Sequence, residues 1–332
     1  PIQETMESWR RVANSGQVLD VALEMNHLAL ESGVRFLFGS GVRAQRDQVL
    51  GPFEVLNREV ARRFKSLIVL PLWLPSPRNL ASRRAIDQID SVVKTLVERH
   101  QEADSRGTLL RALTEAHGGS QGGVQWDRRV RDEIVTLTLA GHETTAALLS
   151  WTWYLLALHP DAAKRVRQEV DHVIGGRAPS ADDLERLTFT EQVLKEALRL
   201  YPPVWIISRR AKRSDQVSGY RIAADGVVAI SPYATHRHPR YWERPDEFDP
   251  SRFEPGRERE RDPFAYFPFG GGPRLCIGGG FALMEAKMVV AAVVQRFRLK
   301  LANRQPVQPE PLVTLRPAGG LPMEVRARQA PD

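Results

Sequence analysis

The sequence predicts a mainly α fold with small β-sheets. Apolar residues recur at the spacing of a helix through most of the chain, and the two-residue alternation of a strand appears only in residues 217–233 and 311–328. The 332 residues are 42% hydrophobic and 26% charged, which is enough apolar material for a large core and excludes a disordered or collagen-like chain. No internal repeat or clean boundary interrupts the pattern, so we expect one domain over residues 1–332.

Each predicted helix ends at residues that disfavour further helix. The first ends at Gly39, and the helix before Pro202 and Pro203 ends because the residue before a proline avoids helical geometry. Residues 117–123 are rich in glycine and indicate a flexible linker. The predicted helices cover residues 18–38, 53–70, 83–100, 134–158, 162–174, 188–200 and 277–297.

Two β-hairpins are expected where strand alternation replaces helical spacing. Residues 224–226, Ala-Asp-Gly, supply the turn of the first hairpin, and Gly319 with Gly320 supplies the turn of the second. Aspartate and glycine favour such turns because they adopt left-handed backbone geometry at little cost.

The charge pattern argues against nucleic-acid binding. There are 47 basic and 40 acidic residues, a formal net charge of +7, but the densest run, residues 257–262, alternates in sign and sums to zero. A basic stripe interleaved with aromatic residues is absent from the sequence, and a modestly basic surface better suits an acidic protein partner. The GxGxxA pattern of residues 39–44 follows a helical segment where a dinucleotide site needs a strand, so that interpretation is weak.

The sequence also favours a soluble, cytoplasmic chain without a membrane span. Residues 1–17 lack the apolar run of a signal peptide, and residues 67–74 are too short to span and are broken by Pro71. Residues 134–158 are long enough, but Glu143 would place a carboxylate in hydrocarbon at a cost of a few kcal/mol. A helix buried in the centre of a soluble domain is the better interpretation.

Cys276 is the one cysteine of the chain, which excludes an internal disulfide, a four-cysteine cluster and a CxxC zinc site. A lone cysteine is most often a small buried hydrophobe. Here glycines at positions 270–272 precede it and a helix is expected directly after it, and both features favour an anionic sulfur. The arrangement indicates a thiolate ligand to a metal, with Arg274 left to face another anion.

A second motif, Ala-Gly-His-Glu-Thr-Thr at residues 140–145, lies in the middle of the helix predicted over residues 134–158. The HExxH zinc pattern fails because Ala146 stands where the second histidine is needed. A core helix whose hydroxyls bond to the preceding turn is one interpretation. The other is a local opening of the helix, since Gly141 weakens it, from which Glu143 and Thr144 deliver protons into a cavity.

Four motifs in this order resemble the cytochrome P450 family of haem-thiolate monooxygenases. After the motif at residues 140–145 come Glu196-x-x-Arg199, Pro-Ser-Arg-Phe at residues 250–253 and FxxGxRxCxG at residues 269–278. By itself, the pair of Glu196 and Arg199 would be interpreted as an ion pair on the surface of a helix. The resemblance extends over residues 18–328 and implies the cytochrome P450 fold. The family's N-terminal helices and part of its sheet have no counterpart, so we expect an N-terminally truncated form.

The resemblance implies a role for each matching residue. Cys276 would be the axial thiolate of haem b, iron protoporphyrin IX, and Glu143 with Thr144 would steer protons to dioxygen. The residues that would contact the haem group are Arg274, Arg209 and His236 at its propionates, and Ala140, Gly141, Phe269 and Gly278 around its ring and thiolate.

Two further sets complete the implied site. Glu196, Arg199 and Arg252 would form an internal ion-pair network that specifies the fold more than it stabilises it. An apolar pocket implies a hydrophobic substrate, and the residues expected to line it are Leu137, Val204, Ile206, Ile207 and Leu321.

The implied reaction inserts one atom of O2 into a hydrophobic small molecule. Two electrons must come from outside, since the chain has neither cluster cysteines nor a convincing dinucleotide site, so a ferredoxin or flavodoxin with its reductase is expected. Two alternatives stay open: a non-catalytic haem-binding remnant and a peroxide-driven peroxygenase.

Overall fold

The computed structural model describes residues 1–39, 46–66, 70–102, 108–116, 128–303 and 305–328. The predicted linker at 117–123 and most of the glycine pattern at 39–44 lie outside the described residues. The chain divides into two compact units: unit 1 is Pro1–Ala147 with Ala302–Val325, and unit 2 is Leu148–Leu301 with Arg326–Asp332. The predicted mainly α fold with small sheets is confirmed, and each unit is described by itself.

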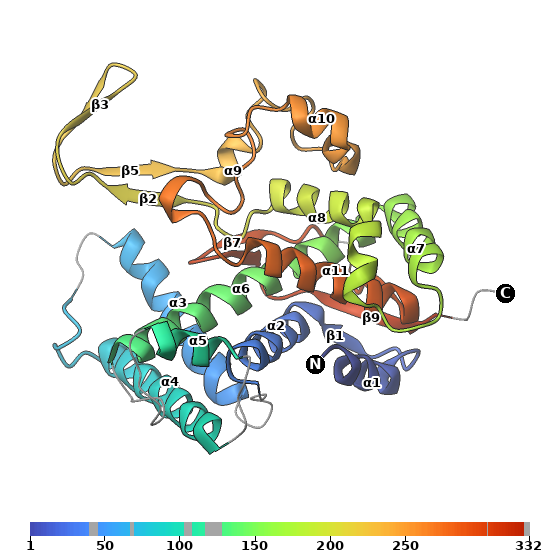
Figure 1. Ribbon diagram of the computed structural model, residues 1–332, viewed down its shortest axis with the longest axis horizontal. Helices are drawn as coiled ribbons and strands as arrows, with labels where there is room; N and C mark the ends of the chain where they lie inside the picture. Colours follow the sequence, from blue (N-terminus) through green and yellow to red (C-terminus); the bar gives the residue numbers. More distant parts are fainter. Residues whose placement is uncertain (40–45, 67–69, 103–107, 117–127, 304, 329–332) are drawn as a thin grey trace. The chain divides into compact units, whose positions relative to one another are not determined.

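Unit 1 is built mainly from helices. The helices α3 (Arg46–Lys65) and α4 (Pro77–Glu102) pack against each other, and α6 (Arg128–Leu158) belongs to this unit as far as Ala147 (Figure 1). Its other helices are α1 (Ile2–Val12), α2 (Val21–Phe38) and α5 (Leu109–Ala116). Both α3 and α6 begin six or seven residues before the predicted starts at 53 and 134.

The helix predicted from residue 18 begins instead at Val21, after a short strand, β1 (Val18–Asp20). Asp20 is the reason, because its Oδ1 accepts hydrogen bonds from the backbone N–H groups of Ala22 at 3.0 Å and Leu23 at 3.3 Å. Such a cap satisfies amides that the first turn leaves without partners, and so it sets the start of α2.

The core of unit 1 lies among the apolar faces of α2, α3, α4, α5 and α6. Helical spacing places these apolar residues on one face of each helix. The packed cluster includes Leu30, Val34, Phe53, Ile89, Val93, Leu96, Leu110 and Ile134. This core holds the first half of α6, which carries the motif at residues 140–145.

Unit 2 is centred on α8 (Thr188–Leu200) and α11 (Gly279–Arg296), which contact each other and α7 (Pro160–Ile174). The interior is apolar and includes Val170, Val193, Ala197, Val290 and Val293. Shorter elements follow α8 along the chain: α9 (Pro232–Thr235), η3 (Pro250–Phe253), α10 (Pro255–Glu260) and η4 (Gly272–Arg274); η2 (Ala181–Arg186) precedes α8, and β6 (Phe297–Leu301) follows α11.

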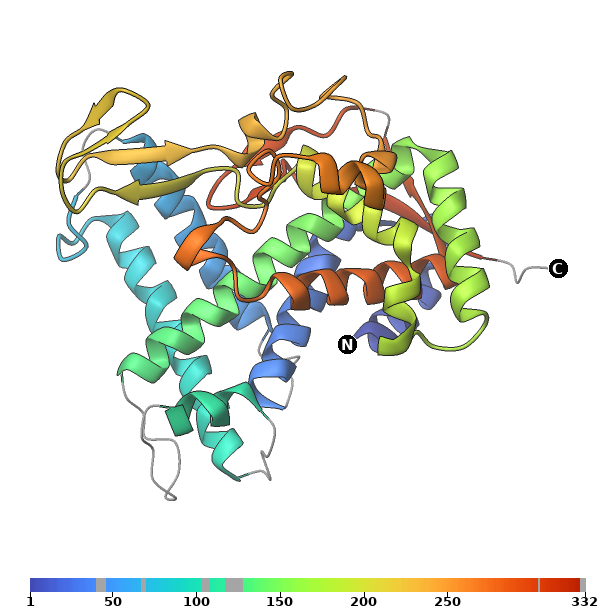
Figure 2. The same ribbon diagram turned by 45° about the horizontal axis from the view of Figure 1, so that its top comes forward.

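Both predicted hairpins are wrong in their strand pairing, although both turns exist. Strand β4 (Tyr220–Ile222) pairs with β3 (Asp215–Val217), whereas β5 (Val227–Ile230) pairs with β2 (Ile207–Arg210), so the four strands form two separate two-stranded sheets (Figure 2). Asp225 lies in the predicted turn with φ +63°, but the turn joins two different pairs.

The second predicted hairpin is replaced in the same way. The turn at Gly319 and Gly320 has φ values of +73° and +87°, but β8 (Leu315–Pro317) pairs with β7 (Pro309–Pro311) and β9 (Pro322–Ala327) pairs with β1. A side chain at Gly320 would collide with Asp20, since its Cβ would lie 2.3 Å from Oδ2. The turn is therefore shaped by its approach to β1 and not by pairing of its own flanks.

Candidate functional site

Cys276 lies in unit 2 on a tight loop between η4 and the start of α11. Its backbone N–H donates to the carbonyl of Phe269 at 3.0 Å, and the N–H of Leu275 donates to the carbonyl of Gly272 at 3.0 Å. Gly270 and Gly272 have φ values of +76° and +68°, a left-handed geometry that glycine adopts without strain. These contacts fold the loop back on itself and leave the thiol exposed.

Glycine is also required where α11 begins. A Cβ at Gly279 would lie 3.2 Å from the ring of Phe269, so the helix starts directly against that ring. A Cβ at Gly278 would lie 3.9 Å from Sγ of Cys276. The sequence placed Phe269 and Gly278 beside the thiolate, and the structure brings both residues to Cys276.

The surroundings of the thiol fit a large apolar ligand. Leu275 is 56% exposed and Ile277 is 90% exposed, although such side chains are normally covered. Among the described residues, no group of three or more His, Cys, Asp and Glu side chains could hold a metal ion. An exposed thiol between two exposed apolar side chains would suit a porphyrin, with the sulfur of Cys276 as the residue that would hold its iron.

Two exposed arginines are the ones predicted to bind the carboxylates of such a ligand. Arg274 lies on the loop itself, and Arg209 lies on β2. A Cβ at Gly270 would lie 3.8 Å from Cδ1 of Ile207, and residues 207 and 209 share one face of the strand. The face of β2 that carries Arg209 therefore meets the cysteine loop.

Glu196 and Arg199 form an ion pair that is entirely buried in unit 2. Nε and Nη2 of Arg199 donate to the two carboxylate oxygens of Glu196 at 2.7 and 2.8 Å, and both side chains are 0% exposed. The carboxylate also accepts the N–H of Asp249 at 2.8 Å, and Nε of Arg252 lies 3.5 Å from it. Burial raises the pKa of Glu196, and the pair with Arg199 opposes that shift.

The remaining donors of Arg199 bind backbone carbonyls far along the chain. Nη1 donates to the carbonyls of His236 at 2.9 Å and Pro245 at 2.5 Å, and Nη2 donates to that of Glu247 at 2.9 Å. One buried guanidinium thus holds residues 236–249 against α8. A planar group with five donors does this better than an ammonium group could.

His236 does not take the role that the sequence suggested. Its ring is fully buried, and Nε2 accepts the backbone N–H of Phe267 at 3.0 Å. Burial lowers the pKa of His236 to about 3, so the ring is neutral and offers no charge to a propionate. Instead His236 connects the Arg199 network to Phe267, whose carbonyl accepts the N–H of Gly270 in the cysteine loop at 2.9 Å.

The motif at residues 140–145 lies in unit 1 on an unbroken stretch of α6. The predicted local opening is not observed: Oγ1 of Thr144 donates to the carbonyl of Ala140 at 2.7 Å, one turn earlier. Ala140 and Gly141 are exposed, and a Cβ at Gly141 would have no neighbour within 4 Å. This face of the helix presents small residues and a hydroxyl to open space.

Glu143 is partly enclosed. Nδ2 of Asn57 in α3 donates to its Oε1, and Thr314 and Arg316 lie close enough to affect its ionisation. Burial raises the pKa of Glu143, and these three neighbours oppose the shift. The sequence did not identify Asn57, because it lies 86 residues from Glu143 in an otherwise unremarkable helix.

The five residues predicted to line a substrate pocket are placed differently from one another. In unit 2, Val204 and Ile206 are 37% and 42% exposed, and Ile207 lies beside the cysteine loop. In unit 1, Leu137 packs against the core, and Leu321 has no exposed surface. The N–H of Leu321 donates to Oδ1 of Asp20 at 2.8 Å and its carbonyl accepts the N–H of Val21 at 2.9 Å, and its buried side chain has no surface with which to contact a substrate.

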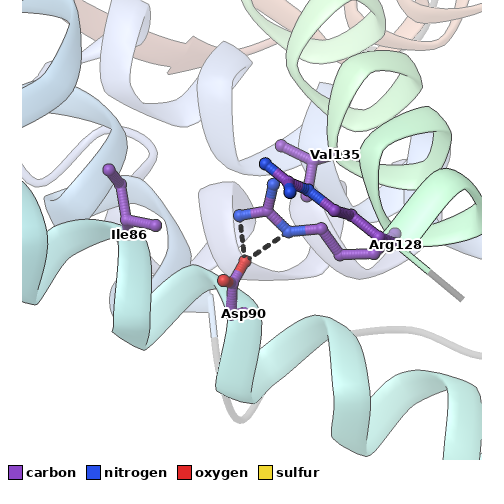
Figure 3. A pocket seen from close by; sticks show the side chains of 5 residues that line it. Ile86, Asp90, Arg128 and Val135 are labelled. Carbon is purple, nitrogen blue, oxygen red and sulfur yellow. Dashed lines mark hydrogen bonds and ion pairs between the residues drawn. The ribbon is translucent and has the colours of Figure 1, made fainter. Parts of the chain in front are cut away.

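A cavity of about 720 Å³ opens between α4 and α6 in unit 1 (Figure 3). The described residues that line it are Ile86, Asp90, Arg128, Arg131 and Val135, and they include no predicted site residue. Nε of Arg131 donates to Asp90 at 2.8 Å across the cavity wall.

Among the described residues, no helix is long and apolar enough to cross a membrane.

Comparison with known proteins places this geometry in a family. Residues 2–322 match the family model described as cytochrome P450. Cyclooctatin synthase of Streptomyces melanosporofaciens is 39% identical over 73% of the chain and 53% of its own length. The putative cytochrome P450 132 of Mycobacterium tuberculosis is 39% identical over 86% of the chain and 61% of its own length. Pentalenene oxygenase of Streptomyces avermitilis is 31% identical over 98% of the chain and 72% of its own length.

A solved structure gives the same result for the fold. The cytochrome P450DA heme domain has a TM-score of 0.86 and 29% sequence identity, covering 99% of this chain and 72% of that one. The chain thus spans about half to three-fifths of the length of the first curated relatives it matches. Haem b is the prosthetic group that this membership implies, and the surroundings of Cys276 fit it. The chain belongs to the cytochrome P450 family.

Proposed function

We propose that the protein is a haem-thiolate monooxygenase that converts R–H, O2, two electrons and two protons into R–OH and water. The observation that carries the proposal is the exposed thiol of Cys276, held on a glycine loop between two exposed apolar side chains. When bound, haem b supplies the iron centre at which dioxygen is reduced. Cys276 would hold that group by its sulfur, and Arg274 and Arg209 would hold its carboxylates.

The rest of the proposed chemistry is proton supply, and it belongs to α6. Glu143 is a carboxyl whose pKa burial has raised, so it both takes up and releases a proton more readily near neutrality than an exposed glutamate does. Thr144 carries a hydroxyl on the open face, and Ala140 and Gly141 leave space beside it. A cooperating acid and alcohol suit the reduction of dioxygen to water.

We propose a substrate of terpene type that is mostly hydrocarbon. Two relatives are named for such oxidations: pentalenene oxygenase and cyclooctat-9-en-7-ol 5-monooxygenase of Streptomyces melanosporofaciens, which is 33% identical over 86% of the chain. The exposed apolar residues Val204 and Ile206 are of the kind that contacts such a substrate. The electrons would come from a separate ferredoxin- or flavodoxin-type carrier with its reductase.

The reduced protein under carbon monoxide tests the proposal directly. The wild type is expected to show the red-shifted Soret band of thiolate ligation, and Cys276→Ser is expected to lose it. A wild-type protein without this band would overturn the proposal. Isotope-labelled O2 then tests insertion, since product must carry one labelled atom.

Thr144→Ala tests proton delivery, with Thr136→Ala as its matched control. Both threonines lie on α6, and each donates to the carbonyl four residues earlier, at 2.7 Å for Thr144 and 2.6 Å for Thr136. We expect Thr144→Ala to lower product formed per electron consumed by about tenfold or more, and Thr136→Ala to leave it unchanged. Equal yields from both variants would contradict the role of Thr144.

Product from peroxide alone would support a peroxygenase, and a thiolate band without product would support a non-catalytic haem protein.

A further inference from the structure

Three segments of unit 1 meet at the side chain of Asn57. Asn57 lies in α3 and is 9% exposed. Its Nδ2 donates to Oε1 of Glu143 in α6, and its Oδ1 accepts the backbone N–H of Val313 at 3.1 Å, in the turn between β7 and β8. A single buried amide therefore joins α3, α6 and this turn at the carboxylate of Glu143.

The backbone of Val313 fixes which end of the amide faces Glu143. A backbone N–H can only donate, so the oxygen of Asn57 must face Val313 and the NH2 group must face the carboxylate. That nitrogen has no lone pair to offer, and it therefore favours the ionised, accepting form of Glu143. A buried polar side chain satisfied at both ends is held firmly in place.

The charges that face Glu143 belong to the same segments. Arg316 in β8 lowers the pKa of Glu143, and Glu54 in α3 raises it. The two are bound to each other, with Nη2 of Arg316 donating to Oε1 of Glu54 at 2.9 Å, and Nε of Arg316 donates to Glu310 at 3.0 Å. Because Glu54 and Glu310 already engage Arg316, the direct donor contact from Asn57 lowers the pKa of Glu143 more than Arg316 does, and Thr314 lowers it as well.

We propose that Asn57 is a positioning residue for Glu143, whose amide holds one carboxylate oxygen toward α3 and the β7–β8 turn and so sets the orientation from which this acid exchanges protons. The inference rests on the proposed function, because it is there that Glu143 delivers protons. Without this contact, Glu143 has fewer donors, turns more freely and ionises less readily.

Two substitutions separate the two hydrogen bonds of Asn57. Asn57→Asp keeps an oxygen for the N–H of Val313 but replaces the donor to Glu143 with a second carboxylate oxygen. Asn57→Leu removes both bonds at similar volume. Asn79→Leu is the matched control, since Asn79 is also buried in unit 1 but its Nδ2 donates to the carbonyls of Pro71 and Leu74, both at 2.8 Å.

The first measurement needs no turnover. The infrared C=O band of protonated Glu143 is identified by its absence in Glu143→Gln and followed against pH. We expect its midpoint to rise by about one pH unit or more in Asn57→Asp, because two carboxylates then face each other, and to rise also in Asn57→Leu. Asn79→Leu is expected to leave the midpoint unchanged.

The second measurement is product formed per electron consumed as a function of pH. We expect Asn57→Asp to lower it several-fold near neutral pH and to shift its pH profile upward, while the carbon monoxide band stays that of the wild type. Asn79→Leu is expected to match the wild type in both respects.

The outcomes distinguish this proposal from the proposed function. An unshifted infrared midpoint with wild-type product yield in Asn57→Asp would overturn the role of Asn57 and leave the monooxygenase proposal intact. A wild type lacking the thiolate band overturns the monooxygenase proposal, and the infrared titration then decides the Asn57 contact by itself. If Asn57→Leu does not fold, Asn57→Asp carries the decision, because it retains the bond to Val313.

Discussion

His142, the neighbour of the proposed acid, shows how burial sets charge at the scale of a single residue. The ring is 3% exposed, its Nδ1 lies 2.9 Å from the carbonyl of Thr138, and its centroid is 5.2 Å from that of Phe53. Burial lowers the pKa of His142 to about 4 from an ordinary 6.5. The side chain is therefore neutral in the folded protein at physiological pH.

This shift predicts a pH-dependent stability. Between pH 6.5 and about 4 the unfolded chain binds a proton at His142 that the folded chain does not, so this contribution is complete above pH 6.5 and is lost as the pH falls. We expect the free energy of unfolding, measured with urea, to fall less steeply with decreasing pH in His142→Leu than in the wild type. The two slopes should differ by up to about 1.4 kcal/mol per pH unit. Burial raises the pKa of Glu143 and of Glu196, and their effect on the pH dependence of stability has the opposite sign to that of His142. The wild type and His142→Leu share this effect, so it cancels in the comparison. Equal slopes would contradict the prediction.

The sequence identified residues whose chemistry is visible in their type, and it missed those whose role depends on folding. Cys276, Glu196 and Arg199 stand in specific spacings, so their motifs predicted them before any contact was known. Asn57 offers no such pattern, since its partner lies 86 residues away. His236 was assigned to the haem propionates on the family resemblance, but complete burial and its bond to Phe267 make it part of the scaffold.

At the scale of elements, the start of α11 decides how the cysteine loop is held. A Cβ at Gly279 would lie 3.2 Å from the Phe269 ring, whereas a Cβ at Gly280 would have no neighbour within 4 Å. Both glycines lie in the first turn of the same helix. The pair therefore separates crowding of the loop from the general effect of alanine in a helix.

We expect Gly279→Ala to displace Phe269, whose carbonyl holds the N–H of Cys276, at a cost of about 1–3 kcal/mol. The measurement is haem retention during gel filtration together with the carbon monoxide band, and both are expected to fall. Gly280→Ala is expected to retain haem and to gain about 0.5–1 kcal/mol of stability, because alanine favours the helix. Normal retention in Gly279→Ala would show that the Phe269 contact is dispensable.

Helices were predictable as elements, and strand pairing was not. Helical periodicity is local, so α8 was predicted over its whole length and α7 and α11 over nearly all of theirs. The observed ends of α2, α3 and α6 differ from the predicted ends by several residues. At α2 the reason is the cap that Asp20 provides. Strand partners are set by distant segments, and so β5 joined β2 and β9 joined β1 in place of the nearest strand. The turns were recognised because glycine and aspartate allow positive φ there.

At the scale of the whole molecule, net charge bears on the arrival of electrons. The formal charge is +7, so an acidic carrier would be attracted over distances that salt screens. We expect the rate of reduction by an acidic ferredoxin to fall about tenfold or more as ionic strength rises from low salt toward 1 M. Reduction by a small uncharged photoreductant serves as the control and is expected to stay constant. Equal salt dependence for both reductants would argue against charge-guided docking.

The chain holds one sulfhydryl, and it is exposed. With Cys276 as the proposed iron ligand, a maleimide should add one mass increment to each molecule without haem and none to a molecule whose sulfur is coordinated. Intact-mass spectra would then give the fraction of loaded molecules without any spectroscopic calibration, and labelling of a fully loaded sample would mean that the iron is bound elsewhere. For the same reason, oxidation of this one atom would inactivate a molecule outright, and storage under reducing conditions should decide how much of the protein can be reconstituted.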